Sequence, residues 1–184
     1  MPLSPCESRQ PIHARTVLCA GYRRDDGRWD IEAKMTDAKS YAVRNDFRSI
    51  AAGGHFHDME MRLRVDDTLL IHAVEASIDA APHRVCPSVT PNFQRLVGLR
   101  IEAGFLAEAR RRLGGVSGCT HLVELLGPMA TTAIQTILPM RLTAAGRTSA
   151  ERPAQIGSCH ALAPSGEVVA KYWPPFSDKN PAQH

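Results

Sequence analysis

Histidine and cysteine side chains that could bind a transition metal are spread along most of the sequence. We expect the metal ligands to be His57, Cys86, Cys119 and Cys159. Imidazole nitrogen and thiolate sulfur are ligands that zinc and iron take in proteins. More than thirty residues separate these cysteines from one another, and the chain has no Cys-x-x-Cys pair. The fold must therefore assemble such a site from distant segments.

Cys119 and His121 stand at the start of the longest helical pattern in the chain. Over residues 122–138 apolar residues recur at the i, i+3, i+4 and i+7 spacing of one helical face. A cysteine in the first turn of a helix lies near unpaired backbone N–H groups and the positive end of the helix dipole, which favour its thiolate. His121 is the expected proton carrier or a further ligand, and Asp58 and Glu124 are the other residues that could move a proton.

Two predicted β-hairpins precede this helix. Residues 12–22 and 28–36 flank an Asp-Gly turn, and residues 57–65 and 70–79 flank a second turn. The last three of these runs alternate apolar and polar residues, which indicates strands with one buried face. His57 falls on the apolar face of its strand, at the mouth of the core, and the residue after it falls on the opposite face.

The remaining segments are expected to be loops, helices and one short strand. Residues 37–54 are predicted as a loop that returns to the sheet, and residues 91–96 and 105–113 as helices. Residues 167–172 are predicted as a short strand or an extended cover. The whole pattern indicates an α+β fold, in which an antiparallel sheet of about four strands is covered by mostly C-terminal helices.

Composition favours a single domain with short extensions. We expect a flexible arm at 1–11, one α+β metal-binding domain at 12–172 and a proline-rich tail at 173–184. A chain of 184 residues can bury a core without disulfide bonds. The formal charge of +3 comes from 22 basic and 19 acidic residues without a long run of one sign, which argues against a nucleic-acid-binding arm.

The same composition bears on location and partners. No stretch approaches the roughly 18 apolar residues of a membrane span, and the first residues lack the apolar core of a signal peptide. We therefore expect a cytoplasmic protein with reduced thiols and without a membrane partner. The tail could lie on a neighbouring copy of the chain, so a homo-oligomer is left open.

Three arginines are candidates to bind a carboxylate-bearing substrate, namely Arg23, Arg24 and Arg84. Guanidinium groups bind carboxylates through paired hydrogen bonds. Ordinary surface salt bridges are the competing interpretation of the same residues. A small molecule is thus the expected partner of the site.

Several short motifs together resemble a bacterial domain-of-unknown-function family that covers nearly the whole chain. The motifs are Tyr22-Arg23-Arg24-Asp25-Asp26-Gly27, His57-Asp58-Met59, Cys86-Pro87, Gly118-Cys119-Thr120-His121-Leu122 and Cys159-His160-Ala161. This resemblance brings no activity with it.

The order of these motifs is similar, more distantly, to that of the iron-sulfur cluster assembly scaffold proteins. That resemblance implies a scaffold-like fold, with His57-Asp58 in the first ligand position, Cys86 in the second and Cys119 with His121 in the third. The scaffolds have Cys-Gly-Asp in the first position and His-Cys at the helix. Here a histidine replaces the first thiolate and the order at the helix is reversed, which suits mononuclear zinc or iron at least as well as a cluster.

These patterns predict a small metal-dependent enzyme, a hydrolase or lyase in which one zinc or iron ion polarises a carbonyl or activates water. The competing class is a non-enzyme, an iron-sulfur cluster carrier or metallochaperone. A metal-free thiol enzyme is a third interpretation, but residues two apart on a helix point apart, which separates Cys119 from His121. Each cysteine can also be a small buried apolar residue, and His57 a hydrogen-bonded histidine at the edge of the core.

Overall fold

The computed structural model describes residues 3–45, 47–145, 152–153 and 155–179. The chain divides into two compact units, Met1–Arg141 and Leu142–His184, whereas the sequence pattern predicts one domain over 12–172. Residues 3–11, predicted as an arm, are exposed and have no regular secondary structure. No helix among the described residues is long and apolar enough to cross a lipid bilayer.

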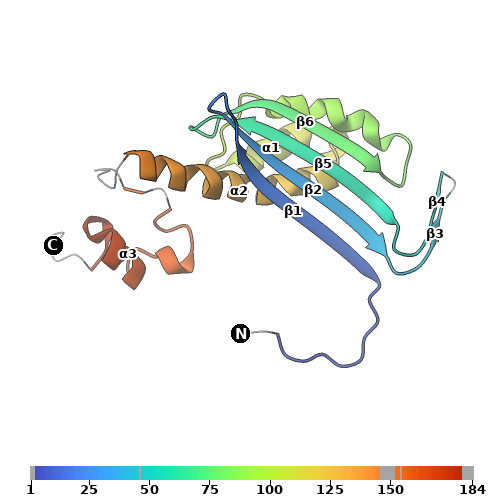
Figure 1. Cartoon of the computed structure of the whole chain (residues 1–184), viewed down its shortest axis with the longest axis horizontal. Coiled ribbons are helices and arrows are strands. Elements are labelled where there is room, and N and C mark those ends of the chain that lie inside the picture. Colours follow the sequence, from blue (N-terminus) through green and yellow to red (C-terminus); the bar gives the residue numbers. More distant parts are fainter. Residues whose placement is uncertain (1–2, 46, 146–151, 154, 180–184) are drawn as a thin grey trace. The chain divides into compact units, whose positions relative to one another are not determined.

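A four-stranded antiparallel sheet forms the centre of the first unit (Figure 1). Its strands, in spatial order, are β1 (His13–Arg23), β2 (Trp29–Lys39), β5 (His55–Val65) and β6 (Ile71–Ala80). Between β2 and β5 the chain forms a small separate ladder of β3 (Val43–Arg44) and β4 (Ser49–Ile50). The predicted α+β class with four antiparallel strands is confirmed.

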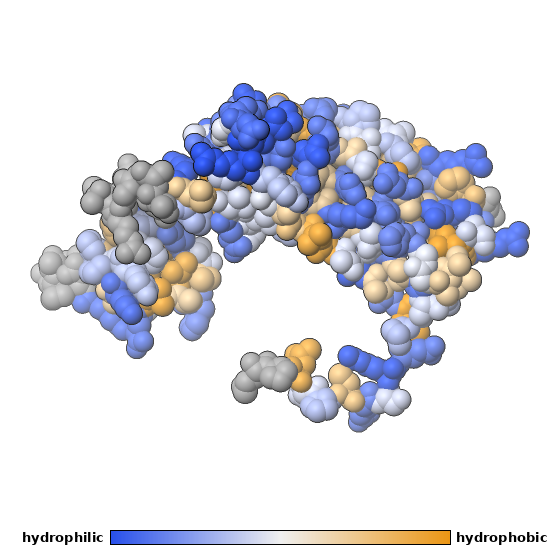
Figure 2. Space-filling view, in the orientation of Figure 1, coloured by the Kyte–Doolittle hydropathy of each residue, from blue (hydrophilic) through white to orange (hydrophobic). Residues whose placement is uncertain are grey.

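Strict alternation in β2 and β5 gives the sheet one apolar face. The buried members of these strands are Trp29, Ile31, Ala33, Met35, Met59, Met61, Leu63 and Val65. The opposite face carries ion pairs across the strands, such as Arg62 with Glu32 at 2.7 Å and Lys34 with Glu60 at 2.6 Å. The side of the sheet turned to the viewer in Figure 2 is accordingly mostly hydrophilic.

Helices cover the apolar face of the sheet and lie behind it in Figure 1. They are the 3₁₀ helix η1 (Cys86–Leu96), α1 (Phe105–Leu113), the short turn η2 (Gly115–Ser117) and α2 (Thr120–Ala145). Phe93, Leu113 and Leu122 from these helices are almost fully buried in the core. The helix predicted over 105–113 is confirmed with the same bounds. The helix predicted over 91–96 begins earlier, at Cys86, with a proline in its first turn, a position where a missing N–H removes no helical hydrogen bond.

Strand β2 is longer than the strand expected over 28–36, and this corrects the loop predicted over 37–54. It continues to Lys39, because its last residues pair with β1 and β5 on both sides. In this added part, Asp37 pairs with Arg15 on β1 and with His57 on β5. The run of apolar residues ends before Asp37, so the apolar pattern alone ends the strand too early.

Helix α2 lies along β1 on the covered face of the sheet. Arg15 contacts Glu124, Cys19 lies beside Thr132 and Gly21 lies against Thr136. Six residues of strand span about 20 Å and twelve residues of helix about 18 Å, so the two elements run in the same direction in register. The helix can approach this closely because Gly21 has no side chain.

We expect Gly21→Ala to destabilise the protein by about 1–3 kcal/mol, because an overpacked interface must shift to admit a methyl group. A Cβ at this position would lie 2.2 Å from Thr136 Oγ1. Urea denaturation measures the change, and Thr136→Ala in the same chain should recover part of it.

The control is Thr136→Ala alone, which removes the atoms nearest to the new Cβ. In that background Gly21→Ala should cost less than it does in the parent. Equal stability of Gly21→Ala and the parent would contradict the close approach of α2 to β1.

The second unit contains the short elements η3 (His160–Leu162), α3 (Glu167–Tyr172) and η4 (Pro174–Phe176). The strand predicted over 167–172 is wrong, since these residues form α3. Val169 is the only buried residue of α3. A short helix can bury this one side chain and satisfy backbone hydrogen bonds within itself, whereas a strand would need a neighbouring strand to pair with. Residues 180–184 of the predicted tail lie outside the described residues.

Candidate functional site

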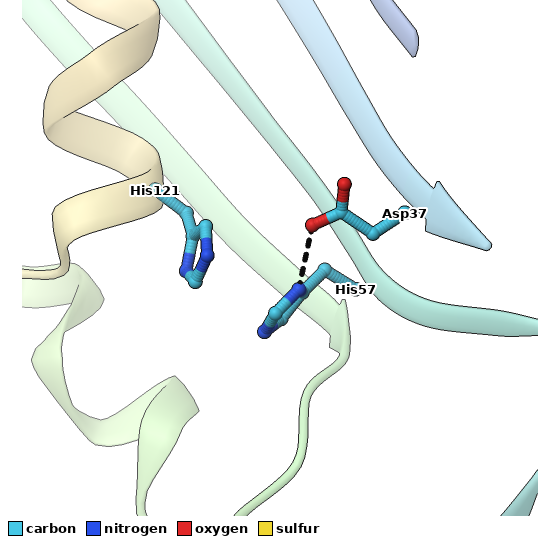
Figure 3. Close-up of side chains that lie close together, drawn as sticks. All are labelled: Asp37, His57 and His121. Carbon is cyan, nitrogen blue, oxygen red and sulfur yellow. Dashed lines mark hydrogen bonds and ion pairs between the residues drawn. The ribbon is translucent and has the colours of Figure 1, made fainter. Parts of the chain in front are cut away.

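Asp37, His57 and His121 meet at one end of the sheet, near the ends of three different elements. Asp37 is near the end of β2, His57 near the start of β5 and His121 in the first turn of α2 (Figure 3). One possible ligand atom from each residue lies within 4.8 Å of the other two. Asp37 and His57 are buried, and His121 is partly buried. This is a cluster of ionisable groups at the edge of an otherwise apolar core.

Strand register and helix position explain how the cluster forms. Asp37 and His57 are directly paired residues of β2 and β5, and both continue the buried face of their strands. A register shift between Asp37 and Ala38 follows at once, where the pairing becomes irregular. Leu122, fully buried against the sheet, fixes the first turn of α2 above this point and with it His121.

Asp37 is the anchor of the cluster. Arg15 donates two hydrogen bonds to it, from Nε to Oδ1 and from Nη2 to Oδ2, each 2.9 Å long. His57 Nδ1 lies 2.8 Å from Oδ2, and His13 Nε2 lies 3.2 Å from Oδ1. Burial alone would raise the pKa of the Asp37 carboxyl, but the hydrogen bonds from Arg15 and His57 outweigh it and hold the pKa well below its ordinary value. Asp37 is therefore a carboxylate with both oxygens already engaged.

An ionised Asp37 fixes the tautomer of His57. The carboxylate can only accept hydrogen bonds, so Nδ1 of His57 must carry the proton that joins them. Unless the ring is doubly protonated, its Nε2 is left with a free lone pair. The buried carboxylate also holds the plane of the ring, which directs Nε2 away from Asp37 (Figure 3). His57 thus presents one oriented nitrogen to the site.

The ring of His121 packs against the ring of His57. The centroids of the His57 and His121 rings lie 4.0 Å apart, with their planes at 40°. Burial lowers the pKa of His121, and the positive charges that His57 and Arg15 can carry lower it further. The neutral imidazole is consequently favoured, which is the form that binds a metal or accepts a proton.

Glu124, predicted to move a proton, follows His121 by about one turn of α2. It contacts the cluster through Arg15. Its Oε2 accepts a 2.8 Å hydrogen bond from Arg15 Nη1. About half of the Glu124 side chain is exposed. Arg15 therefore joins a solvent-facing carboxylate on α2 to the buried carboxylate on β2.

Asp58, the other predicted proton carrier, lies on the opposite face of β5 from His57. It accepts a hydrogen bond from His55 Nδ1 at 2.9 Å and lies 3.2 Å from Lys34 Nζ. The carboxylate that orients His57 is Asp37, which sequence reasoning missed. The signal was present in the sequence: continuing the alternation of Trp29 to Met35 by one step places a carboxylate on the buried face.

The cysteines predicted as metal ligands lie elsewhere than in the three-residue cluster. Cys86 and Cys119 are partly buried and pack against the hydrophobic core, at the starts of η1 and α2. Cys159 is exposed and belongs to the second unit. Among the residues that the structure describes, the cluster brings together His57 and His121 of the predicted site and adds Asp37.

The three predicted substrate-binding arginines lie at both ends of the sheet. Arg23 stacks over Trp29, with 5.8 Å between its guanidinium carbon and the ring centroid, and Arg24 pairs with Asp30 at 2.9 Å. This end of β2 is eight residues from Asp37, about 26 Å along an extended strand. Arg84 follows β6 and so lies at the same end of the sheet as His57.

Comparison with known proteins places the chain in a family but assigns it no activity. No curated protein and no solved structure matches it, so the resemblance to iron-sulfur scaffolds stays a prediction. The family match runs over residues 13–135, which include β1, β2, β5 and the first turns of α2, and therefore every residue of the cluster around Asp37. The predicted motif at Cys159 falls outside it. The chain belongs to the family of proteins of unknown function DUF2889.

Proposed function

We propose that the protein is a small metal-dependent enzyme whose zinc or iron ion is held by His57 and His121. The observation that carries the proposal is the convergence of two imidazoles and a buried carboxylate from three elements within 4.8 Å. His57 would bind through Nε2, because its Nδ1 is committed to Asp37. A histidine ligand usually donates its other ring N–H to a carboxylate, and the hydrogen bond to Asp37 has this form.

Two further features support a metal at this position. The lowered pKa of His121 favours the neutral ring that a cation requires. Asp37 with Arg15 holds His57 rigidly, so that little ordering is needed when a ligand binds. On this proposal the thiolate of Cys86 or Cys119, at the starts of η1 and α2 and outside the three-residue cluster, joins the ligand set when metal binds, and the reduced thiols that this requires are typical of the cytoplasm.

The proposed reaction class is hydrolysis or lyase chemistry on a small molecule. A bound metal ion would supply Lewis acidity, which polarises a carbonyl or lowers the pKa of water. The protein supplies orientation through Arg15, which joins Glu124 to Asp37, while the neutral ring of His121 can accept a proton and the half-exposed Glu124 can exchange one with solvent. Asp58 lies on the far face of β5, which leaves it outside this set of residues.

Elemental analysis of untagged protein, purified anaerobically without chelator, tests the proposal. We expect about one equivalent of zinc or iron per chain, because His57 is already oriented and a neutral His121 is favoured, so little ordering opposes binding. Metal below about a tenth of an equivalent, with no uptake on addition of zinc or ferrous iron, would overturn it. A brown protein with the visible absorbance of an iron-sulfur cluster would indicate the cluster carrier instead.

A metal-free acid–base site is the second candidate, and the saturation of Asp37 favours it. Both oxygens of this carboxylate already accept hydrogen bonds, so it functions as the partner of His57 rather than as a free ligand. A buried Asp–His pair makes Nε2 of the histidine a general base, and the ring of His121 packs beside it. Protein that still binds its small-molecule substrate and still catalyses its reaction after the metal is removed would support this metal-free site.

A further inference from the structure

Two arginines that pair with no carboxylate of the described residues line a cavity at the end of the sheet that holds His57. The cavity has a volume of about 240 Å³ and is lined by Phe47, Arg48, Ile78, Asp79, Ala81, His83, Arg84 and Pro87. Its walls come from the loop between β3 and β4, the end of β6 and the start of η1. These segments leave the sheet where β5 begins.

The position of each guanidinium group is fixed without a carboxylate. Arg48 donates to the backbone oxygens of Ala81 and His55, at 3.4 and 3.3 Å, and Arg84 stacks 4.9 Å from the Phe47 ring centroid. Neither forms an ion pair with a carboxylate of the described residues. Two ordered cations in one cavity therefore keep their donors available.

The charge and shape of the cavity define what fits it. The two guanidinium groups of Arg48 and Arg84 outnumber the one acid in the lining, Asp79, so the cavity favours a negative charge. Phe47, Ile78 and Pro87 form apolar walls beside the two guanidinium groups. A small organic anion with a compact apolar body satisfies both features.

The location connects this cavity to the candidate metal site. The carbonyl that Arg48 holds belongs to His55, two residues before His57 on β5. Cys86, between Arg84 and Pro87 of the lining, is among the proposed ligands. The anion-binding cavity and the proposed metal site thus lie at the same end of the sheet.

We propose that Arg48 and Arg84 bind the anionic group, a carboxylate or a phosphate, of a small organic molecule. This assignment of a substrate class rests on the proposed function. Binding of the anion does not require the metal, so anion binding is measured separately from metal content.

NMR titration of the full chain with benzoate, phenyl phosphate and neutral benzamide tests the proposal. We expect benzoate or phenyl phosphate to shift the amide signals of residues 47–48 and 79–84, and the anion that binds more tightly identifies the anionic group. Arg84→Met should weaken this binding about tenfold or more, because it removes a charged hydrogen-bond donor. Arg84→Lys should recover part of the affinity, since it restores the charge without the planar fork.

The matched control is Arg23→Met, which also removes an arginine stacked on an aromatic ring but lies at the other end of the sheet. The Arg23→Met variant should bind the anion as tightly as the parent protein does. Equal binding of benzamide and benzoate, no binding of either anion, or unchanged affinity in Arg84→Met would overturn the proposal. His57→Ala should keep anion binding, so a failure of the metal proposal leaves this measurement intact and the two can fail separately.

Discussion

His57→Ala is expected to abolish stoichiometric metal binding and to leave the fold intact. The variant removes the nitrogen that Asp37 orients, while the core residues of β5 and α2 stay in place. The cost in unfolding free energy should be about 1–3 kcal/mol, because Asp37 loses one hydrogen-bond donor but keeps Arg15. Metal per chain and urea denaturation, measured on the same preparation, separate the two effects.

A second histidine–carboxylate pair in the chain provides the control. His72 Nε2 lies 2.8 Å from Asp66 Oδ2, the same separation as between His57 Nδ1 and Asp37 Oδ2. This pair sits at the β5–β6 turn, near the opposite end of β5 from His57. His72→Ala should therefore lose a similar hydrogen bond and keep its metal. Full metal content in His57→Ala would show that His57 is only a structural histidine.

The same assay decides which thiolate completes the ligand set. His121→Ala should lose metal as His57→Ala does, because both rings belong to the cluster. Cys86→Ser and Cys119→Ser should weaken metal binding more than Cys159→Ser if the ligands come from the end of the sheet where β6 stops and α2 starts. Equal losses from Cys159→Ser and from the other two variants would contradict this choice of thiolate.

Asp37→Asn is expected to have the largest effect on stability. The carboxylate is about 1% exposed and joins Arg15, His13 and His57, so its replacement leaves a guanidinium group without its counter-ion. Removing one partner of a buried ion pair costs several kcal/mol, and the partial exposure of Arg15 reduces this to about 2–4 kcal/mol. Metal affinity should fall about 10–100-fold, because the ligand histidine loses its orienting carboxylate.

The effect should depend on pH in one direction. Because the folded-state pKa of Asp37 lies below its unfolded value, its contribution to stability is complete above about pH 4 and declines as the pH falls toward the folded-state pKa. The difference between parent and Asp37→Asn in unfolding free energy should therefore shrink as the pH falls below about 4. A difference that keeps growing as the pH falls below about 4 would contradict the ionised state of Asp37.

Asp58→Asn is the matched control for this variant. Asp58 also accepts a hydrogen bond from a histidine, His55, but it does so on the charged face of the sheet beside half-exposed Lys34. Ion pairs of this kind contribute about 1 kcal/mol or less. Asp58→Asn should keep its metal and nearly all of its stability. A larger loss of metal and of stability in Asp58→Asn than in Asp37→Asn would indicate that Asp58 belongs to the site.

Local pattern predicted most of the elements of the first unit. Strict alternation over Trp29–Met35 and Met59–Val65 fixes both the strand type and its buried face, because side chains on a strand alternate between two sides. The spacing of apolar residues after His121 fixes α2 and its buried face in the same way. For the same reason the sequence placed His57 and His121 at the margin of the core, and both belong to the cluster.

The partners of His57 were decided only by the tertiary structure. Asp37 lies twenty residues before His57 and Arg15 lies twenty-two residues before Asp37, and strand register alone sets them side by side. A carboxylate on a buried face interrupts the apolar pattern, and only its contacts with Arg15, His13 and His57 offset the cost of burying it. Sequence periodicity reports the period of burial, whereas the pairing of charges depends on the register between strands far apart in the chain. The sequence by itself therefore determined which elements form and which faces they bury, and the fold determined that Asp37, rather than Asp58, holds the histidine of the site.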